Sequence, residues 1–280
     1  MPEAPEVANV LAWLEDELKG RKIVKAEITH PKLAQNMDPE SFCRKLEGQT
    51  FREFHRYGKY LVFVLDDVDL VGHLRMEGKF LIGDPAEMEP RQAKHIHAVF
   101  DLDDGRKLCY YDTRKFGRMQ VLDKTEDYRQ LPVFEKLGKD VFDDSLNAEY
   151  LYQKLHKKRI PIKTALLDQS VIAGIGNIYA DEILFHSRIH PEEPCCRLSM
   201  SDFSHIARWT KEVLSKSVES GGTTIRTFSY GNHQPGSFQD QLMVHQREGE
   251  PCFLCGTPVE SMKVGQRSTC LCPQCQKRKS

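Results

Sequence analysis

The sequence predicts an α+β protein of several domains, with an N-terminal β-sandwich or barrel that opens on a helix, a helical second region and a small metal-stabilised segment at the end. Three observations predict this order. Many short β-type segments follow one helical segment in the first half, helical periodicity replaces them after about residue 148, and two Cys-x-x-Cys pairs stand near the C-terminus.

Length and charge narrow the class of protein. The 280 residues can form two domains, or one large domain with a small appendage. No apolar run is long enough to span a membrane, and the acidic N-terminus does not resemble a secretion signal. The net charge is −1, but residues 1–150 carry −6 and residues 151–280 carry +5. A basic second half fits a polyanionic partner such as a nucleic acid.

The first half begins with a helix over residues 5–19, where Val7, Leu11 and Leu18 follow helical spacing and Gly20 ends the pattern. Gly, Asp and Pro turns separate the β-type segments that follow. These segments are 22–28, 50–65, 69–74, 80–82, 95–102 and 108–111. Residues 124–148 lose periodicity and are interpreted as a linker.

The second half is mainly helical. The predicted helical segments are 150–155, 163–168, 177–185 and 200–218, and the last one stops at Gly221-Gly222. Residues 223–250 contain several glycines without periodicity, so a long loop is expected there.

The four cysteines that form two pairs predict a metal site. Cys252 and Cys255 are separated by sixteen residues from Cys272 and Cys275. Four thiolates in this spacing complete the tetrahedron of a structural zinc ion and leave no open position for catalysis. Cys270 lies out of register. Basic residues around the pairs, among them Lys263 and Arg267, suit a nucleic-acid surface, although a solvated charged surface would have the same composition.

The first residues, Met1 to Val7, carry possible covalent chemistry. If Met1 is removed, Pro2 becomes a terminal secondary amine that can form an iminium, and Glu3 can donate or accept a proton beside it. The alternative is structural, because proline and acidic residues also suit the first turn of a helix.

Three further stretches resemble ligand contacts. Gly174-Ile175-Gly176-Asn177 can expose amides to a phosphate at a helix start, with Asn177 as the cap. His73 to Met76 and Asp112 to Met119 each place a basic residue beside a bulky apolar one, a combination that proteins use to distort DNA. Met76 and Phe116 would equally suit a core. In Arg56 to Tyr60, Lys59 follows a glycine and could contact a phosphate or assist proton transfer.

Taken together, these motifs resemble the bacterial formamidopyrimidine-DNA glycosylases, also called 8-oxoguanine DNA glycosylases or AP lyases. The resemblance covers nearly the whole chain in order. It rests on Met-Pro-Glu-x-Pro-Glu-Val at the start, Gly58-Lys59-Tyr60, His73-Leu74-x-Met76, Asp112 to Gly117, Gly174 to Ala180, Gly221 to Thr224, Gly249 to Cys252 and Gln266 to Thr269.

The resemblance implies a bifunctional base-excision-repair enzyme for oxidised purines. The damaged base is flipped out of duplex DNA, Pro2 attacks the sugar and forms a Schiff base, and β,δ-elimination nicks the strand. By position, Glu3 is expected to protonate the opening sugar and Glu6 to support the amine. Lys59 and Arg267 are expected to serve the first and second eliminations.

The resemblance also implies the DNA contacts. Met76, Arg114 and Phe116 are expected to fill the vacated space and read the opposite cytosine. Lys59, His73 and Asn177 are expected to hold phosphates. His95, Arg114 and Arg159 are further expected DNA contacts, and Thr223 and Thr224 begin a loop that covers the flipped base.

The implied domain division has five parts. They are a catalytic β-sandwich at 1–130, a linker at 131–149, a helix–two-turns–helix DNA-binding domain at 150–222, a lesion-capping loop at 223–245 and a zinc finger at 246–280. One structural Zn²⁺, a damaged duplex DNA partner, a monomer and a cytoplasmic, nucleoid-associated location in a bacterium are expected.

The chain departs from the family pattern at three places. Ala4 replaces the usual Leu or Gly, Arg159 stands where lysine is common, and His245-Gln246 stands where Tyr-Gly is typical, which affects one phosphate contact. Alternatives are an endonuclease VIII-like glycosylase for oxidised pyrimidines and a non-enzymatic zinc-bearing DNA-binding protein. A small-molecule tautomerase with an N-terminal proline is a third, which the zinc pairs and the basic second half disfavour.

Overall fold

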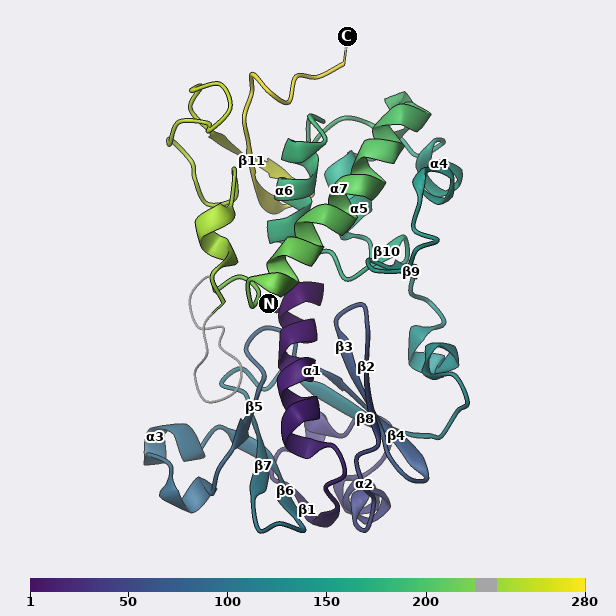
Figure 1. The fold of residues 1–280 in the computed structure, drawn as a ribbon, viewed down its shortest axis with the longest axis vertical. Helices are drawn as coiled ribbons and strands as arrows, with labels where there is room; N and C mark the ends of the chain where they lie inside the picture. The colour runs from purple at the N-terminus through teal and green to yellow at the C-terminus, as the bar shows by residue number, and fades with distance from the viewer. Residues whose placement is uncertain (225–235, 280) are drawn as a thin grey trace. The chain divides into compact units, whose positions relative to one another are not determined.

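The computed structural model describes residues 1–224 and 236–279 (Figure 1). The chain separates into two compact units. The first comprises residues 1–135 with 221–236, and the second comprises residues 136–220 with 237–280. The finer division into five segments stays a prediction.

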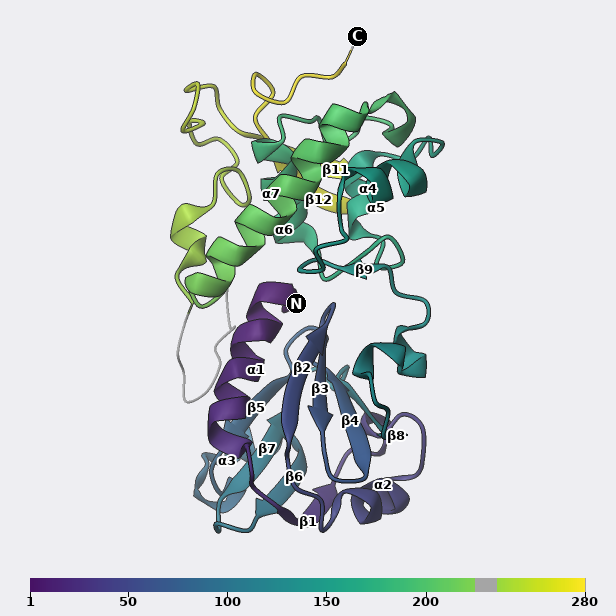
Figure 2. The same ribbon diagram turned by 45° about the vertical axis from the view of Figure 1, so that its right-hand side comes forward.

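The first unit is a β-sandwich of two four-stranded antiparallel sheets (Figure 2). One sheet has the order β2 (Glu53–Tyr57), β3 (Tyr60–Val64), β4 (Val68–His73) and β8 (Arg118–Asp123). The other has the order β1 (Ile23–Ile28), β6 (Ile96–Leu102), β7 (Lys107–Tyr111) and β5 (Lys79–Ile82). The chain crosses from the first sheet to the second after β4 and returns before β8.

Helix α1 (Ala4–Leu18) packs its apolar face into the core of this sandwich. Val7, Leu14 and Leu18 are at most 1% exposed. Burial of three such side chains contributes several kcal/mol, at roughly 1.5–3 kcal/mol each. Because Glu3 is the residue before the helix, the packing of this face also fixes where the chain's N-terminus lies.

Three of the longer elements of this unit differ from the expectation. The segment 50–65 is two strands, because Gly58 adopts a left-handed φ of 57° and turns the chain back at Lys59. Helix α2 (Pro39–Leu46) and strand β8 were not predicted. Each is short and buries only two apolar side chains, Phe42 and Leu46 in α2 and Met119 and Val121 in β8, which is too few to make a period visible.

The remaining short elements among the described residues of the first unit are α3 (Pro90–Ala93) and four 3₁₀ turns. These turns are η1 (Pro31–Leu33), η2 (Pro85–Glu87), η3 (Tyr128–Gln130) and η4 (Pro132–Phe134). The last two lie in the segment that lost periodicity.

The second unit is helical with a C-terminal β-hairpin (Figure 1). Its helices are α4 (Ala148–Leu155), α5 (Ile162–Leu167), α6 (Asn177–His186) and α7 (Met200–Glu219), with η5 (Cys195–Arg197) and η6 (Phe238–Gln241). Strands β9 (Lys139–Asp140) and β10 (Ile172–Ala173) form a small parallel pair, and β11 (Glu260–Val264) pairs with β12 (Arg267–Leu271).

Helix α6 packs against α5, α7 and β12 in the second unit. Residues 179–185 are all buried, including Asp181 and Glu182. Two buried carboxylates in this helix require partners, and the partners come from α5, from the hairpin and from the segment before the hairpin.

Among the described residues, no helix combines the length and the apolar character that a membrane crossing requires.

Candidate functional site

The N-terminus is held by the carboxylate of Glu6. Its Oε2 accepts the backbone N–H of Glu3 at 2.9 Å, and its Oε1 accepts the N–H of Thr223 at 2.8 Å. Gly222 lies directly over Glu6 with a φ of 83°, and an added Cβ would be 3.2 Å from Oε1. Pro2, Glu3 and Glu6 are all buried. A single side chain therefore fixes the chain's start against the Gly222-Thr223 segment.

The charges of Lys59, Glu3 and Glu6 all act on the pKa of the terminal amine. Burial lowers the pKa of the terminal ammonium of Met1 below its ordinary 8.0, while Glu3 and Glu6 oppose this and Lys59 adds to it. Lys59 itself is only 5% exposed, in the turn between β2 and β3 that Arg56 holds through the carbonyl of Gly58 at 2.7 Å. An amine in this position loses its proton more easily than one in water, which favours nucleophilic chemistry.

His73 ends β4 as a neutral imidazole. Its Nδ1 accepts the N–H of Arg75 at 2.9 Å, so the proton of the neutral ring resides on Nε2. Burial, with added repulsion from Arg75 and Lys59, lowers the pKa of His73 from 6.5 to about 3. Its ring meets Tyr60 edge-on, with centroids 4.6 Å apart. His73 is therefore a fixed hydrogen-bond donor, suited to a phosphate oxygen.

Three residues expected to probe the DNA stack lie on two turns of the first unit. Met76 is 40% exposed and Phe116 is 47% exposed, so neither belongs to the core. The guanidinium carbon of Arg114 lies 4.8 Å from the centre of the Phe116 ring. His95 lies just before β6, half-buried against Tyr111 with ring centroids 5.7 Å apart.

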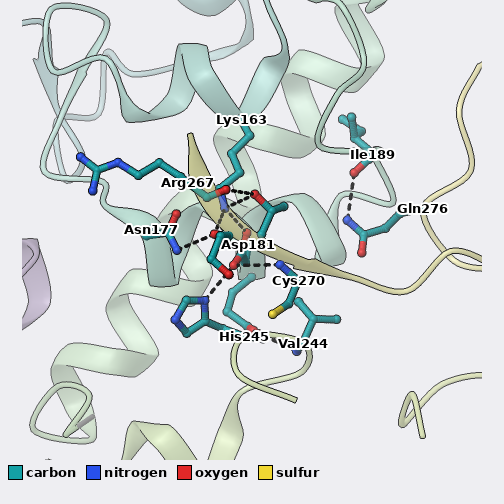
Figure 3. A network of polar contacts seen from close by, with 12 residues as sticks. Lys163, Asn177, Asp181, Ile189, Val244, His245, Arg267, Cys270 and Gln276 are labelled. Atoms are coloured by element: carbon teal, nitrogen blue, oxygen red, sulfur yellow. Dashed lines mark hydrogen bonds and ion pairs between the residues drawn. The ribbon is translucent and has the colours of Figure 1, made fainter. Parts of the chain in front are cut away.

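In the second unit, the carbonyl oxygen of Ser268 joins two expected site residues (Figure 3). Asn177, the first residue of α6, donates its side-chain N–H to this oxygen at 2.9 Å. Ser268 directly follows Arg267, which is exposed at the start of β12. The expected phosphate contact and the expected acid of the second elimination are thus structurally coupled.

A buried ion pair supports the same strand (Figure 3). Lys163 and Asp181 are fully buried, with Nζ and Oδ1 2.6 Å apart. The ammonium also donates to the carbonyl of Ser268 at 2.9 Å and to the hydroxyl of Thr269 at 2.8 Å. Asp181 Oδ2 accepts the N–H of Cys270 at 3.3 Å and lies 2.7 Å from Nδ1 of His245.

Glu182, the next residue on α6, fixes the segment that carries His245. Its two oxygens accept the backbone N–H groups of Met243, Val244 and His245 at 2.8–3.0 Å. Burial raises the pKa of Glu182. Lys163, Asp181 and Glu182 were not predicted from the sequence, because a lysine and two acids within helical segments give no signal of their partners.

Four sulfur atoms converge in the C-terminal segment. The Sγ atoms of Cys252, Cys255, Cys272 and Cys275 all lie within 4.8 Å of one another. A tetrahedral zinc–thiolate site with bonds of about 2.3 Å requires sulfur separations of roughly 3.8 Å. The observed 3.5 Å between Cys255 and Cys272, and 4.0 Å between Cys252 and Cys275, fit this requirement. Cys270 is buried but not part of the cluster.

Family models cover most of the chain in three consecutive pieces. Residues 1–119 match the formamidopyrimidine-DNA glycosylase N-terminal domain, and residues 137–229 match the formamidopyrimidine-DNA glycosylase H2TH domain. Residues 249–278 match the zinc finger found in FPG and IleRS.

Curated relatives match over their full length. The formamidopyrimidine-DNA glycosylase of Bacillus cereus (strain ZK / E33L) is 43% identical over 279 residues, which is 99% of this chain and 100% of the relative. The chain belongs to the formamidopyrimidine-DNA glycosylase family. The glycosylase of Exiguobacterium sibiricum is likewise 43% identical over 277 residues, covering 99% of both chains.

Solved structures of the formamidopyrimidine-DNA glycosylase family share the fold. A complex of the Lactococcus lactis protein with an abasic site containing DNA superposes with a TM-score of 0.90 at 35% identity, covering 99% of this chain and 100% of that one. A variant of the same protein, bound to a Fapy-dG containing DNA, gives 0.90 at 36% identity with the same coverage.

Several predictions are thereby confirmed. The chain is a glycosylase with AP lyase activity that acts in bacterial base excision repair of oxidised purines. The fold class, namely an N-terminal β-sandwich, a helix–two-turns–helix region and a four-cysteine zinc finger with one structural Zn²⁺, is also confirmed. The individual roles of the site residues stay predictions.

Two details of the expected phosphate site at the start of α6 are wrong. Gly176 is the residue before the helix, and Asn177 bonds to Ser268 instead of capping. The amide of Gly174 is not exposed, because it donates to the side chain of Gln169 at 3.0 Å. The tight packing of α6 leaves this backbone buried.

The remaining expected contacts lie as follows. Arg159 is exposed between α4 and α5. Thr223 is buried, and the hydroxyl of Thr224 accepts the N–H of Gly236 at 2.8 Å. Residues 225–235 of the expected lesion-capping loop, which was predicted over 223–245, lie outside the described residues.

Proposed function

We propose that Pro2 of the mature chain is the nucleophile that excises the damaged base and that Glu3 is its acid partner. The observation that carries this proposal is the burial of Pro2 and Glu3 at the start of α1. Burial and the charge of Lys59 also lower the pKa of the terminal ammonium, which Met1 carries here. Removal of Met1 converts the amide nitrogen of Pro2 into a secondary amine. Attack on the sugar carbon breaks the bond to the base, and Glu3 protonates the opening ring oxygen.

Iminium formation acidifies the neighbouring sugar protons, so elimination follows from the same intermediate. Lys59 in the first unit is assigned to the first elimination and Arg267 in the second unit to the second. Glu6 supports Pro2 indirectly, because it holds the backbone of Glu3 at 2.9 Å. The zinc supplies structure only, since its four cysteine ligands complete the coordination shell.

Residues of each unit are likewise assigned to DNA contacts. Lys59, His73 and Asn177 are assigned to phosphates, with His95 and Arg159 as further contacts. Met76, Arg114 and Phe116 are assigned to the space left by the flipped base and to the opposite cytosine. Thr223 and Thr224 are assigned to the start of the capping loop. The substrate is damaged duplex DNA carrying 8-oxoguanine or a formamidopyrimidine.

The proposed domain boundaries are those expected from the sequence, with parts ending at residues 130, 149, 222, 245 and 280. A monomer in the cytoplasm, associated with the nucleoid, fits a DNA substrate and an odd number of cysteines without an evident disulfide pattern.

Borohydride reduction in the presence of an abasic-site duplex tests the nucleophile. Mature protein lacking Met1, as verified by mass, is expected to form a covalent adduct with the DNA, and Pro2→Gly is expected to form it much more slowly. Protein that retains Met1 is the matched control and should form none. Absence of an adduct with mature protein would leave a zinc-bearing DNA-binding protein as the alternative.

A further inference from the structure

Two turns of the first unit connect the same two sheets. Residues 74–78 lead from β4 to β5, and residues 112–117 lead from β7 back to β8. His73 at the end of β4 lies opposite Arg118 of β8, and Lys79 of β5 lies opposite Tyr111 of β7. Because the strands on both sides are paired, the two turns leave the same end of the sandwich side by side.

Each turn presents one bulky apolar side chain directly after a residue in the left-handed region. Arg75 has a φ of 56° and precedes Met76, and Lys115 has a φ of 58° and precedes Phe116. Residues other than glycine adopt this conformation at a cost, and they keep it only when their surroundings hold them there. The two exposed side chains therefore depend on groups that fix the backbone around them.

Asp112 is the group that fixes the second turn. Its side chain is fully buried, and Oδ1 accepts the N–H of Arg114 at 2.9 Å. Oδ2 accepts the N–H groups of Phe116 at 2.9 Å and Gly117 at 2.8 Å. Three bonds from one carboxylate thus hold the backbone on both sides of Lys115.

Asp112 is itself held through its own backbone. Its N–H donates to the carbonyl of His95 at 3.0 Å, and its carbonyl accepts Nε2–H of the buried His97 at 2.8 Å. Every polar atom of Asp112 has a partner, so the carboxylate is rigidly placed on the strand pair β6–β7.

Two contacts tie the first turn to the second. An added Cβ at Gly117 would lie 1.7 Å from the hydroxyl oxygen of Tyr110, and one at Gly78 would lie 2.2 Å from the same oxygen. Both turns therefore close on one side chain. In addition, the hydroxyl of Thr113 donates to the carboxylate of Glu77, next to Met76.

We propose that Asp112 is a positioning residue that sets how strongly the enzyme discriminates the base opposite the lesion. The proposal rests on the function proposed above for Met76, Arg114 and Phe116. Recognition of a base edge requires a donor in a fixed direction, and Arg114 gains its direction from the Asp112-bonded backbone and from the Phe116 ring 4.8 Å away. The Thr113–Glu77 bond extends this order to the turn of Met76.

Asp112→Asn tests the proposal at nearly constant volume. The amide keeps one acceptor oxygen but turns an NH₂ group toward a backbone N–H, so at least one of the three bonds is lost. Base release is measured in single turnover on duplexes with 8-oxoguanine opposite cytosine or adenine. Borohydride trapping counts the competent molecules in each preparation. The cytosine-to-adenine rate ratio is expected to fall roughly five-fold, as the loss of one hydrogen bond predicts. An unchanged ratio overturns the proposal.

Asp69→Asn is the matched control. Asp69 is equally buried on β4 of the same unit, but it bonds to Thr125 far from both turns, and its substitution is expected to leave the ratio unchanged. If Asp112→Asn does not fold, Thr113→Val decides instead. It keeps Asp112 and removes the bond to Glu77, and it is expected to lower the ratio roughly two-fold, a weaker loss of the same kind. An unchanged ratio there also overturns the proposal.

Arg114→Ala separates this proposal from the function on which it rests. A ratio that falls with Arg114→Ala but not with Asp112→Asn contradicts the positioning role alone. A ratio that is unchanged with Arg114→Ala contradicts the assigned role of the turn itself.

Discussion

At the scale of single residues, His73 shows how local bonding sets chemical character. The N–H of Arg75 occupies Nδ1, and burial keeps the ring neutral. The same imidazole in water would carry a charge below about pH 6.5 and would lack a fixed donor direction. The neutral ring can donate one hydrogen bond from Nε2 at any pH well above its pKa of about 3.

The lowered pKa of His73 predicts a pH dependence of stability. Between pH 6.5 and about 3, His73 is protonated in the unfolded chain but neutral in the folded chain. Stability therefore falls as pH falls through this window, by at most about 1.4 kcal/mol per pH unit from this group. His73→Gln is expected to remove this contribution, measured by urea unfolding at several pH values. Equal slopes in both proteins would contradict the assignment.

At the scale of elements, a buried ion pair links α5, α6 and β12. Lys163 of α5 pairs with Asp181 of α6 and donates hydrogen bonds to β12. Lys163 and Asp181 neutralise each other, and the hairpin and His245 complete their bonding. Breaking such a pair from one side leaves an uncompensated buried charge, whereas replacing both charges avoids that cost.

Lys163→Met is therefore expected to destabilise the protein by about 3–5 kcal/mol. The double substitution Lys163→Met with Asp181→Leu is expected to recover part of the loss, as measured by chemical denaturation. Lys211→Met is the control, because its pair with Asp144 is exposed and contributes only about 0–1 kcal/mol. A double variant no more stable than the single one would contradict the charge explanation.

The zinc finger is also linked by hydrogen bonds to the loop that follows α6. The buried Gln276 accepts the N–H of Cys272 at 2.9 Å and donates to the carbonyl of Ile189 at 3.0 Å, in the loop after α6. These bonds attach the finger to the rest of the second unit. Zinc bound by the four cysteines would in turn stiffen the hairpin, in which Arg267 is the first residue of β12.

At the scale of the whole molecule, DNA binding is expected to depend on an intact finger and on the basic second half. Cys255→Ser is expected to lose zinc and with it measurable duplex affinity, because a structural zinc site contributes directly to folding. The control is Cys196→Ser, an exposed cysteine outside the cluster. Zinc content and duplex binding at several salt concentrations are the measurements. In the parent protein affinity should fall steeply with salt as phosphate contacts release counterions. Normal affinity in zinc-free Cys255→Ser would contradict the role of the finger.

Much of the fold was readable from the sequence. The period of α1, the strands bounded by Gly and Asp turns and the spacing of the cysteine pairs each carry a local signal. The two short elements α2 and β8 were not predicted, because each buries only two apolar side chains. The site residues were predicted from short motifs. Pro2 and Glu3 lie in a proline-containing segment at the start of the sequence, and Lys59 directly follows Gly58.

The sequence by itself determined the chemistry that is available, namely a proline at position 2, four thiols in zinc spacing and a family pattern over nearly the whole chain. Only the tertiary structure decided which atoms those groups bond. Asp112 holding the Arg114–Phe116 turn, Glu6 bonding to Thr223 and Lys163 bonding to strand β12 all follow from chain segments brought together by packing. A buried polar group must find a partner wherever the fold supplies one, and that partner leaves no periodic trace in the sequence.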